Sequence, residues 1–175
     1  VPTIQAFKYF FFFFLDEFPD LDPLTKEKIK TTLYNARMNR EELIRKALEF
    51  MREISQNASL ALLERQIFYS GLADMLNIPE FQKIDRLRQI LSVLEDYSAL
   101  SKIFNQNNSD EEVKVLFGKE TGLDALEDYA VIFSEVRLYN NTKGFIAVIG
   151  PNRIPYSKTI PAIGFISRVL SQVVS

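Results

Sequence analysis

The chain of 175 residues contains no cysteine, no histidine and no tryptophan. Without cysteine and histidine there can be no thiol nucleophile, disulfide, Cys/His zinc site or histidine general base. Only six glycines occur, and no segment matches the glycine-rich G-x-x-x-x-G-K-[ST] or G-x-G-x-x-G phosphate loops. The lack of cysteine leaves the compartment undetermined, although it suits a reducing cytosol, and the location that we expect is cytoplasmic.

The charges are nearly balanced, with 21 Lys and Arg against 23 Asp and Glu, so the composition does not require a basic face for nucleic acid. The apolar run Phe10–Leu15 is far shorter than the ~20 residues that a membrane span needs. Paired acidic residues are adjacent in sequence, which points their side chains apart. We therefore expect no enzyme activity, no cofactor and no metal site. The pairs are Asp16/Glu17, Glu111/Glu112 and Glu127/Asp128.

The first part of the chain is predicted to be helical. Residues 3–18 place phenylalanine on every face of a helix, which calls for burial on all sides. Asp22 followed by Pro23 predicts a helix start, and Asn39 predicts the N-cap of a helix over residues 40–56. Apolar spacing then predicts two long helices, over 58–77 and 79–105, joined by a short turn. Such an αα-hairpin is a common way to build a dimer interface.

The second part is predicted to contain strands. The polar stretch 105–112 interrupts the helical spacing. Residues 113–118 alternate with a period of two, and 129–149 are predicted to be a β-hairpin around a turn of polar residues and glycine. A helix is expected over 156–174. The fold class is therefore α+β: a helix-rich N-terminal part with an αα-hairpin, then a small antiparallel sheet of about three strands covered by a C-terminal helix. We expect three regions, namely 1–57 with linker and body helices, 58–106 with the αα-hairpin, and 111–175 with the sheet.

One short segment stands out as a candidate site. Gly150 and Pro151 end a strand, because glycine allows a sharp turn and proline cannot donate to a ladder. Arg153 and Tyr156 follow at the start of the last helix, where free N–H groups favour an anion. The segment could be a ligand cradle, a catalytic turn or only a corner of the fold. With no second basic residue and no glycine-rich loop, the corner is the favoured interpretation.

The same segment carries a family resemblance. Residues 149–156, Ile-Gly-Pro-Asn-Arg-Ile-Pro-Tyr, resemble the Ile-Gly-Pro-Thr-Arg-Met-Asp-Tyr segment of the HrcA family, the heat-inducible transcription repressors of bacteria. The Asp that could cap the last helix is replaced by Pro155. A long section that the family carries between Leu60 and Phe68 is absent. Further resemblances follow in the family's order: Val1-Pro2-Thr3 with Phe7-Lys8, Phe68-Tyr69-Ser70-Gly71-Leu72, Pro79-Glu80-Phe81 and Phe117-Gly118-Lys119-Glu120.

The resemblance implies the regulatory and dimerisation region of such a repressor, with a shortened GAF-like sheet. The parent protein would bind an inverted-repeat operator as a homodimer through a winged-helix domain preceding Val1, repress chaperone operons and respond to a GroEL-type chaperonin. The alternative is a GAF-like small-molecule sensor, with Arg153 and Tyr156 at the mouth of its pocket. Pairing of two sheets along the edge 113–118 is a second possible dimer contact. For the αα-hairpin, the expected interface residues are Phe68, Tyr69, Leu72, Leu87, Leu91 and Leu94.

Overall fold

The computed structural model describes residue 6 and residues 18–79 and 83–174. The Phe-rich helix expected over 3–18 falls, apart from positions 6 and 18, outside the described residues. The described helices are α2 (Pro23–Ala36), α3 (Arg40–Ser55), α4 (Ile84–Leu94), α5 (Tyr97–Gln106) and α6 (Tyr156–Val173), with short 3-10 helices η2 (Leu72–Asn77), η4 (Gly118–Thr121), η5 (Asp124–Leu126) and η6 (Tyr139–Asn141).

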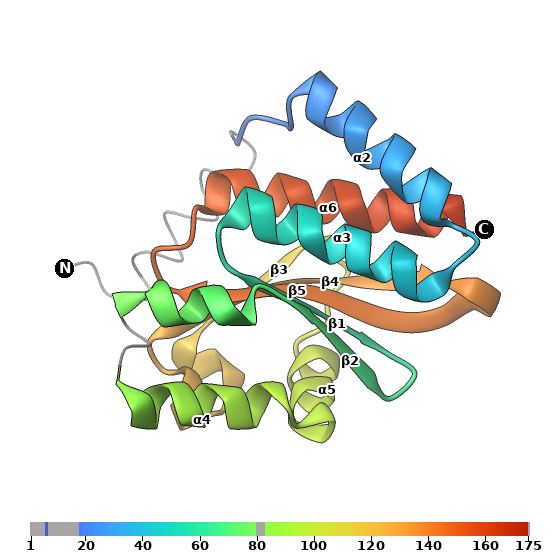
Figure 1. The fold of residues 1–175 in the computed structure, drawn as a ribbon. Coiled ribbons are helices and arrows are strands. Elements are labelled where there is room, and N and C mark those ends of the chain that lie inside the picture. The colour runs from blue at the N-terminus through green and yellow to red at the C-terminus, as the bar shows by residue number, and fades with distance from the viewer. Residues whose placement is uncertain (1–5, 7–17, 80–82, 175) are drawn as a thin grey trace.

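A single antiparallel sheet forms the middle of the molecule (Figure 1). Its strands lie in the order β2-β1-β5-β4-β3, so β2 and β3 are the two edges. The long β4–β5 hairpin supplies the centre, and β1 joins it through β5. The strands are β1 (Ala58–Leu63), β2 (Gln66–Ser70), β3 (Lys114–Phe117), β4 (Tyr129–Leu138) and β5 (Thr142–Pro151).

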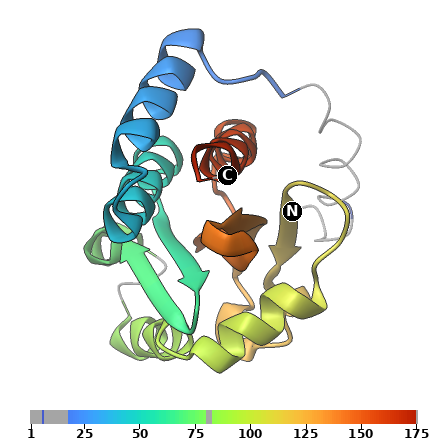
Figure 2. The ribbon, with the colours of Figure 1, turned by 90° about the vertical axis from the view of Figure 1, so that its right-hand side faces the viewer.

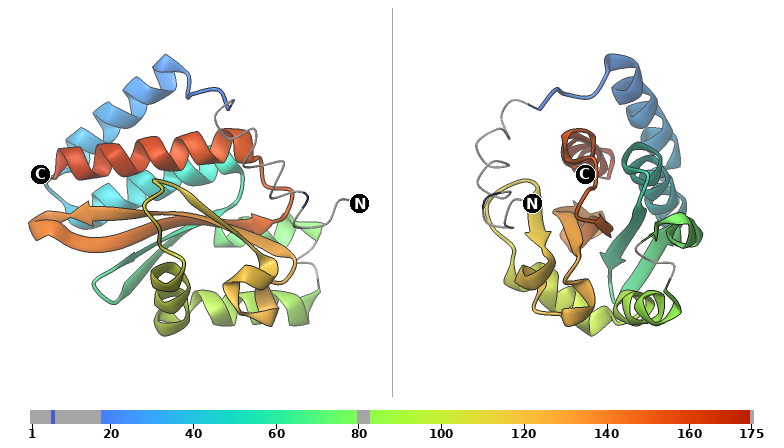
Figure 3. Two further views of the ribbon diagram at one scale, coloured as in Figure 1. Left: turned by 180° about the vertical axis from the view of Figure 1, so that it is seen from behind. Right: turned by 90° about the vertical axis from the view of Figure 1, so that its left-hand side faces the viewer.

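Helices cover both faces of this sheet. In Figure 1, α3 and α6 lie above the sheet with α2 stacked outside them, while α4 and α5 lie below it. The end-on view in Figure 2 and the two views in Figure 3 show the same arrangement, with the sheet between the helices above it and the helices below it. The sheet therefore has a hydrophobic core on each side.

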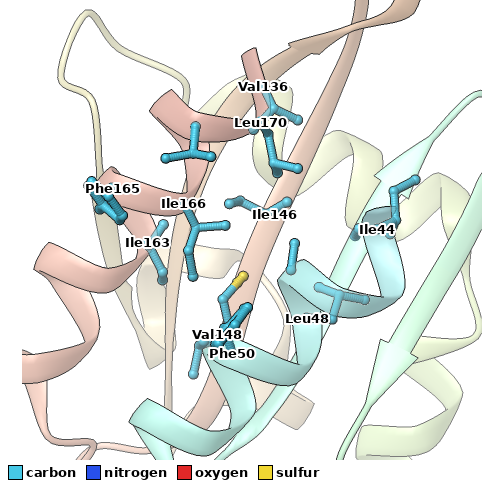
Figure 4. Packing of buried hydrophobic residues seen from close by; sticks show 14 of the residues in the cluster. Ile44, Leu48, Phe50, Val136, Ile146, Val148, Ile163, Phe165, Ile166 and Leu170 are labelled. Carbon is cyan, nitrogen blue, oxygen red and sulfur yellow. The ribbon is translucent and has the colours of Figure 1, made fainter. Parts of the chain in front are cut away.

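The core above the sheet is formed largely by α3 and α6. Figure 4 shows Ile44 and Leu48 of α3 directed toward the same space as Ile166 and Leu170 of α6, over the β5 side chain Ile146. All five are at most 2% exposed. Burying side chains of this size contributes about 1.5–3 kcal/mol each before conformational entropy is counted, so this packing holds the helices on the sheet.

The two helix starts predicted near the N-terminus are confirmed. The carboxylate of Asp22 accepts a hydrogen bond from the backbone N–H of Thr25 at 3.3 Å, and Pro23 occupies the first helical turn. The side chain of Asn39 accepts from the N–H of Glu42 at 3.1 Å. The C-terminal helix and the β-hairpin of residues 129–149 are also confirmed, as α6 and as β4–β5.

The predicted αα-hairpin is wrong. Residues 58–63 and 66–70 form the strand pair β1–β2, followed by the 3-10 helix η2, and two separate helices replace the one expected over 79–105. Every residue of β1 is buried, because both faces of the sheet are covered, so the strand shows no polar alternation. Its Leu and Ala residues favour helices locally, and the tertiary environment overrides that preference.

The sheet consequently has five strands, where about three were expected. The coarser class, α+β with an antiparallel sheet and a C-terminal helix, is correct. Residues 58–70 belong to the same sheet as residues 114–151. The strand expected over 113–118 forms as β3 and lies at an edge.

Candidate functional site

The corner between β5 and α6 is held by packing. A Cβ atom at Gly150 would stand 2.3 Å from Oδ1 of Asn57, so only glycine leaves room for that carboxamide. Pro151 ends the strand opposite Tyr129. The N–H of Ile154 donates to the carbonyl of Pro151 at 3.0 Å and closes the turn.

Tyr156 fastens the same corner from the start of α6. Its hydroxyl donates to the carbonyl of Asn152 at 2.7 Å, and its ring centroid lies 5.9 Å from that of Phe117. The side chain is buried, and this burial raises the pKa of the phenol well above its ordinary value. A neutral, buried phenol bonded to a backbone carbonyl stabilises a turn rather than taking part in proton transfer.

The start of α6 offers little to a ligand. Pro155 occupies the N-cap position and makes no side-chain cap, which agrees with the loss of the family's Asp at this position. The N–H groups of Lys158 and Thr159 donate to the carbonyl of Pro155. Arg153 is exposed, three residues before the helix begins at Tyr156. The geometry of Gly150, Pro151 and Tyr156 thus fits a corner of the fold better than a binding cradle.

The core below the sheet is filled by aromatic side chains. The ring of Phe104 lies 4.9 Å from that of Phe133 and 5.3 Å from that of Phe145, between centroids. All three side chains are at most 4% exposed. A small-molecule sensor needs a cavity of hundreds of Å³, and these three rings leave no such space between the sheet and α5.

The acidic pairs weighed as catalytic candidates form surface ion pairs. Glu112 accepts two hydrogen bonds from Arg168 at 2.6 Å, Asp128 pairs with Arg86 at 2.5 Å, and Glu127 with Lys119 at 3.8 Å. The pair Asp16/Glu17 lies outside the described residues. Within the described ranges no three acidic side chains gather closely enough to hold a metal ion. No helix in this part of the chain has the length and apolar character of a membrane span.

The six residues expected at a dimer interface are divided between the faces of the sheet. Tyr69, Leu72, Leu87, Leu91 and Leu94 belong to the core below the sheet, whereas Phe68 packs against the core above it. Leu94 is only 1% exposed, and its carbonyl accepts a hydrogen bond from the hydroxyl of Tyr69. The structure therefore places five of the six in one core below the sheet, and Leu94 is already buried within the chain.

The β1–β2 hairpin was not foreseen in the sequence. Its two-residue turn consists of Glu64 (φ 49°) and Arg65 (φ 67°), both in the left-handed region. Such turns ordinarily carry Asn-Gly or Asp-Gly, so the usual sequence signal is absent. The one local hint was the run Ile67-Phe68-Tyr69, whose β-branched and aromatic residues favour strands. The hairpin leaves β2 as an outer strand with partly exposed side chains.

Comparison with known families agrees with this architecture. The fold is an α+β domain with a helix-covered antiparallel sheet. The family model described as "HrcA protein C terminal domain" matches residues 20–160. The chain belongs to the HrcA family.

Curated relatives support the same assignment. The heat-inducible transcription repressor HrcA of Carboxydothermus hydrogenoformans is 33% identical over 152 residues, covering 85% of this chain and 43% of that protein. The protein of the same name from Herpetosiphon aurantiacus is 35% identical over 107 residues, covering 61% of this chain and 30% of that protein. The chain thus spans less than half the length of the curated relatives that it matches.

A solved structure shows the same fold. A crystal structure described as that of a hypothetical protein superposes with a TM-score of 0.78 at 13% sequence identity, covering 99% of this chain and 79% of that chain. At such low identity the likeness concerns the fold alone.

Proposed function

We propose that this chain is the dimerisation and regulatory region of a heat-inducible transcription repressor. A winged-helix domain of the parent protein would contact the inverted-repeat operator upstream of chaperone operons. Two copies of this chain would together hold two such DNA-binding domains at a fixed separation, as recognition of a two-fold symmetric operator requires. The proposal implies a cytoplasmic protein.

The observation that carries the proposal is the family match over residues 20–160. The relatives named heat-inducible transcription repressors are longer than this chain, which leaves room in them for a DNA-reading part. The near balance of 21 basic and 23 acidic residues supports a role for this region other than contact with phosphates. We further propose that the sheet is a shortened GAF-like sheet and that a GroEL-type chaperonin acts on the parent protein. The burial of Tyr156 against Phe117, where the mouth of a sensor pocket was expected, disfavours the sensor alternative.

A fusion experiment tests the dimerisation role. The chain is joined to a monomeric DNA-binding domain that represses a reporter only when two copies are held together on an inverted repeat. We expect the fusion to repress the reporter strongly and to lose that repression when one half-site is deleted. Repression no better than that of the unfused DNA-binding domain would contradict the proposed role. A matched pull-down with a GroEL-type chaperonin, with and without ATP, tests the chaperonin contact separately.

A further inference from the structure

Among the described residues no strand pairs with the outer edge of β2, and this edge has the features of a self-pairing surface. We propose that two copies of the chain associate through β2, so that their five-stranded sheets join into one continuous sheet across a two-fold axis at Phe68. This inference rests on the homodimer proposed above and names its contact surface. The occupant of the edge is a second copy of the same strand.

The backbone of β2 determines which groups face outward. Leu63 and Gln66 flank the two-residue turn and pair with each other, which makes them a hydrogen-bonded pair of the antiparallel ladder. Pairs of the two kinds alternate along such a ladder. Ile67 and Tyr69, opposite Leu62 and Leu60, therefore fall at non-hydrogen-bonded positions. Their N–H and C=O groups point to the free edge of the sheet.

A two-fold axis at Phe68 satisfies these four groups. Antiparallel pairing around Phe68 sets Ile67 opposite Tyr69 of the second copy and the reverse, and each such pair exchanges two hydrogen bonds. Four backbone hydrogen bonds result. The polarity of the strand is also symmetric about this point, since Gln66 meets Ser70, the apolar Ile67 meets the apolar Tyr69, and Phe68 meets itself. A strand with this pattern is complementary to its own copy, as an isologous interface requires.

The edge lacks the features that normally prevent sheet pairing. Natural edge strands are protected by charged residues, proline or bulges. The sequence of β2, Gln-Ile-Phe-Tyr-Ser, contains no charge and no proline, and its register with β1 is unbroken by a bulge. The other edge strand, β3, contains one charged residue, Lys114, which is only 7% exposed. Charged residues flank both strands, with Glu64 and Arg65 before β2 and Asp110–Glu112 before β3, so what distinguishes β2 is that all five of its own residues are uncharged.

The side chains of β2 are suited to burial at such a contact. Ile67, Phe68 and Tyr69 are only partly buried in the single chain, whereas all six residues of β1 are buried. Phe68 lies on the upper face beside α3, and Ile67 and Tyr69 lie on the lower face. Joining the sheets would cover both sets, because Phe68 would face its copy in a non-hydrogen-bonded pair at a Cα separation of about 4.5 Å, and Ile67 would face Tyr69 in hydrogen-bonded pairs at about 5.5 Å.

Single-cysteine variants test the contact directly, because the chain has no cysteine of its own. Phe68→Cys places two thiols across the axis at a Cα separation within the range of about 4.4–6.8 Å that a disulfide tolerates. Val115→Cys is the matched control, since Val115 is also a partly buried edge-strand residue on the upper face. Under mild oxidation we expect most of the Phe68→Cys protein to form a covalent dimer and the Val115→Cys protein to remain uncrosslinked.

A second variant removes an intermolecular hydrogen bond without disturbing the hairpin. The N–H of Ile67 points outward, so Ile67→Pro deletes a donor that β1 does not use. A symmetric dimer loses two such bonds, and we expect its dissociation constant to rise about 100-fold. Ile67→Val, which keeps the donor, should leave the dissociation constant within about threefold of the wild-type value. Circular dichroism verifies that each variant is folded.

The outcomes separate this inference from the dimer proposal. A wild-type chain that stays monomeric overturns both. A wild-type dimer in which Phe68→Cys fails to crosslink overturns the β2 contact and leaves the dimer proposal standing. Crosslinking of Val115→Cys in preference to Phe68→Cys assigns the interface to the β3 edge and also overturns the inference. If Ile67→Pro does not fold, the pair of cysteine variants still decides the question.

Discussion

The carboxamide of Asn57 occupies the space that a side chain at Gly150 would need. A Cβ at Gly150 would lie 2.3 Å from Oδ1 and 2.7 Å from Cγ of Asn57. Asn57 cannot easily withdraw, because its Nδ2 donates to the carbonyl of Ser55 at 2.8 Å. The contact locks the segment after α3 to the end of β5 and so sets the corner from which α6 starts.

Gly150→Ala is therefore expected to destabilise the chain. Overpacking of this kind typically costs about 1–3 kcal/mol, and the free energy of unfolding from urea titrations measures it. Asn57→Ala removes the obstructing group, so in the double variant the two losses should not add. Strict additivity of the two changes would show that the carboxamide is not what requires glycine at position 150.

The β1–β2 turn offers a stabilising substitution. Arg65 has a φ of 67°, a conformation that costs an L-residue about 1–2 kcal/mol and glycine almost nothing. After the larger chain entropy of unfolded glycine is subtracted, Arg65→Gly should raise the free energy of unfolding by about 0.5–1 kcal/mol. Arg65→Ala keeps the strain and serves as the control. A glycine variant less stable than the alanine variant would contradict the assigned turn.

Tyr156 predicts a dependence of stability on alkaline pH. Burial raises the pKa of its phenol in the folded state, whereas in the unfolded chain it titrates near its ordinary value of about 10. Above that pH the unfolded state loses the proton first, so the folded state is increasingly disfavoured. The stability that depends on the neutral phenol is complete below about pH 10 and declines as the pH rises further.

Tyr156→Phe isolates this contribution. At neutral pH the variant loses the hydrogen bond to Asn152 and should be less stable by about 1 kcal/mol. Between about pH 10 and 11 its stability should fall less steeply than that of the wild type. Parallel curves for the wild type and Tyr156→Phe would contradict the prediction.

The aromatic core below the sheet predicts a large loss on truncation. Phe133 is fully buried and contacts the rings of both Phe104 and Phe145. Phe133→Ala should cost about 3–5 kcal/mol, which calorimetry would show as a much lower melting temperature. Tyr34→Ala, on the exposed face of α2, should cost less than about 1 kcal/mol. A small loss at Phe133 would contradict the tight packing of the three rings.

Parts of the fold could be predicted because their signals are local. Asp22 with Pro23 and Asn39 are capping residues whose hydrogen bonds lie within one helical turn. The polar turn before Gly144 separates two strand-forming runs and gives the β4–β5 hairpin. Residues 58–70 carry no such signal: β1 is buried on both faces, and its turn uses Glu64 and Arg65. That segment forms a strand pair because of its contacts with the rest of the sheet. The αα-hairpin was predicted wrongly because the apolar spacing considered only the segment itself.

The candidate site, too, could be predicted only where its signals are local. Gly150, Pro151 and Tyr156 could be recognised as a special turn, but the reason lies in Asn57 and Phe117, which are distant in sequence. The expected interface residues on β2 and α4 could be selected as apolar, yet their division between two faces depends on the strand assignment. The edge position of β2 could not be predicted either, because the segment was not recognised as a strand.

Sedimentation velocity of the purified chain at tens of micromolar tests the proposed dimer, since a region that holds two DNA-binding domains must itself be two-fold. We expect a single species of about 40 kDa, twice the 20.2 kDa of one chain. A species of 20.2 kDa across the whole concentration range would contradict it.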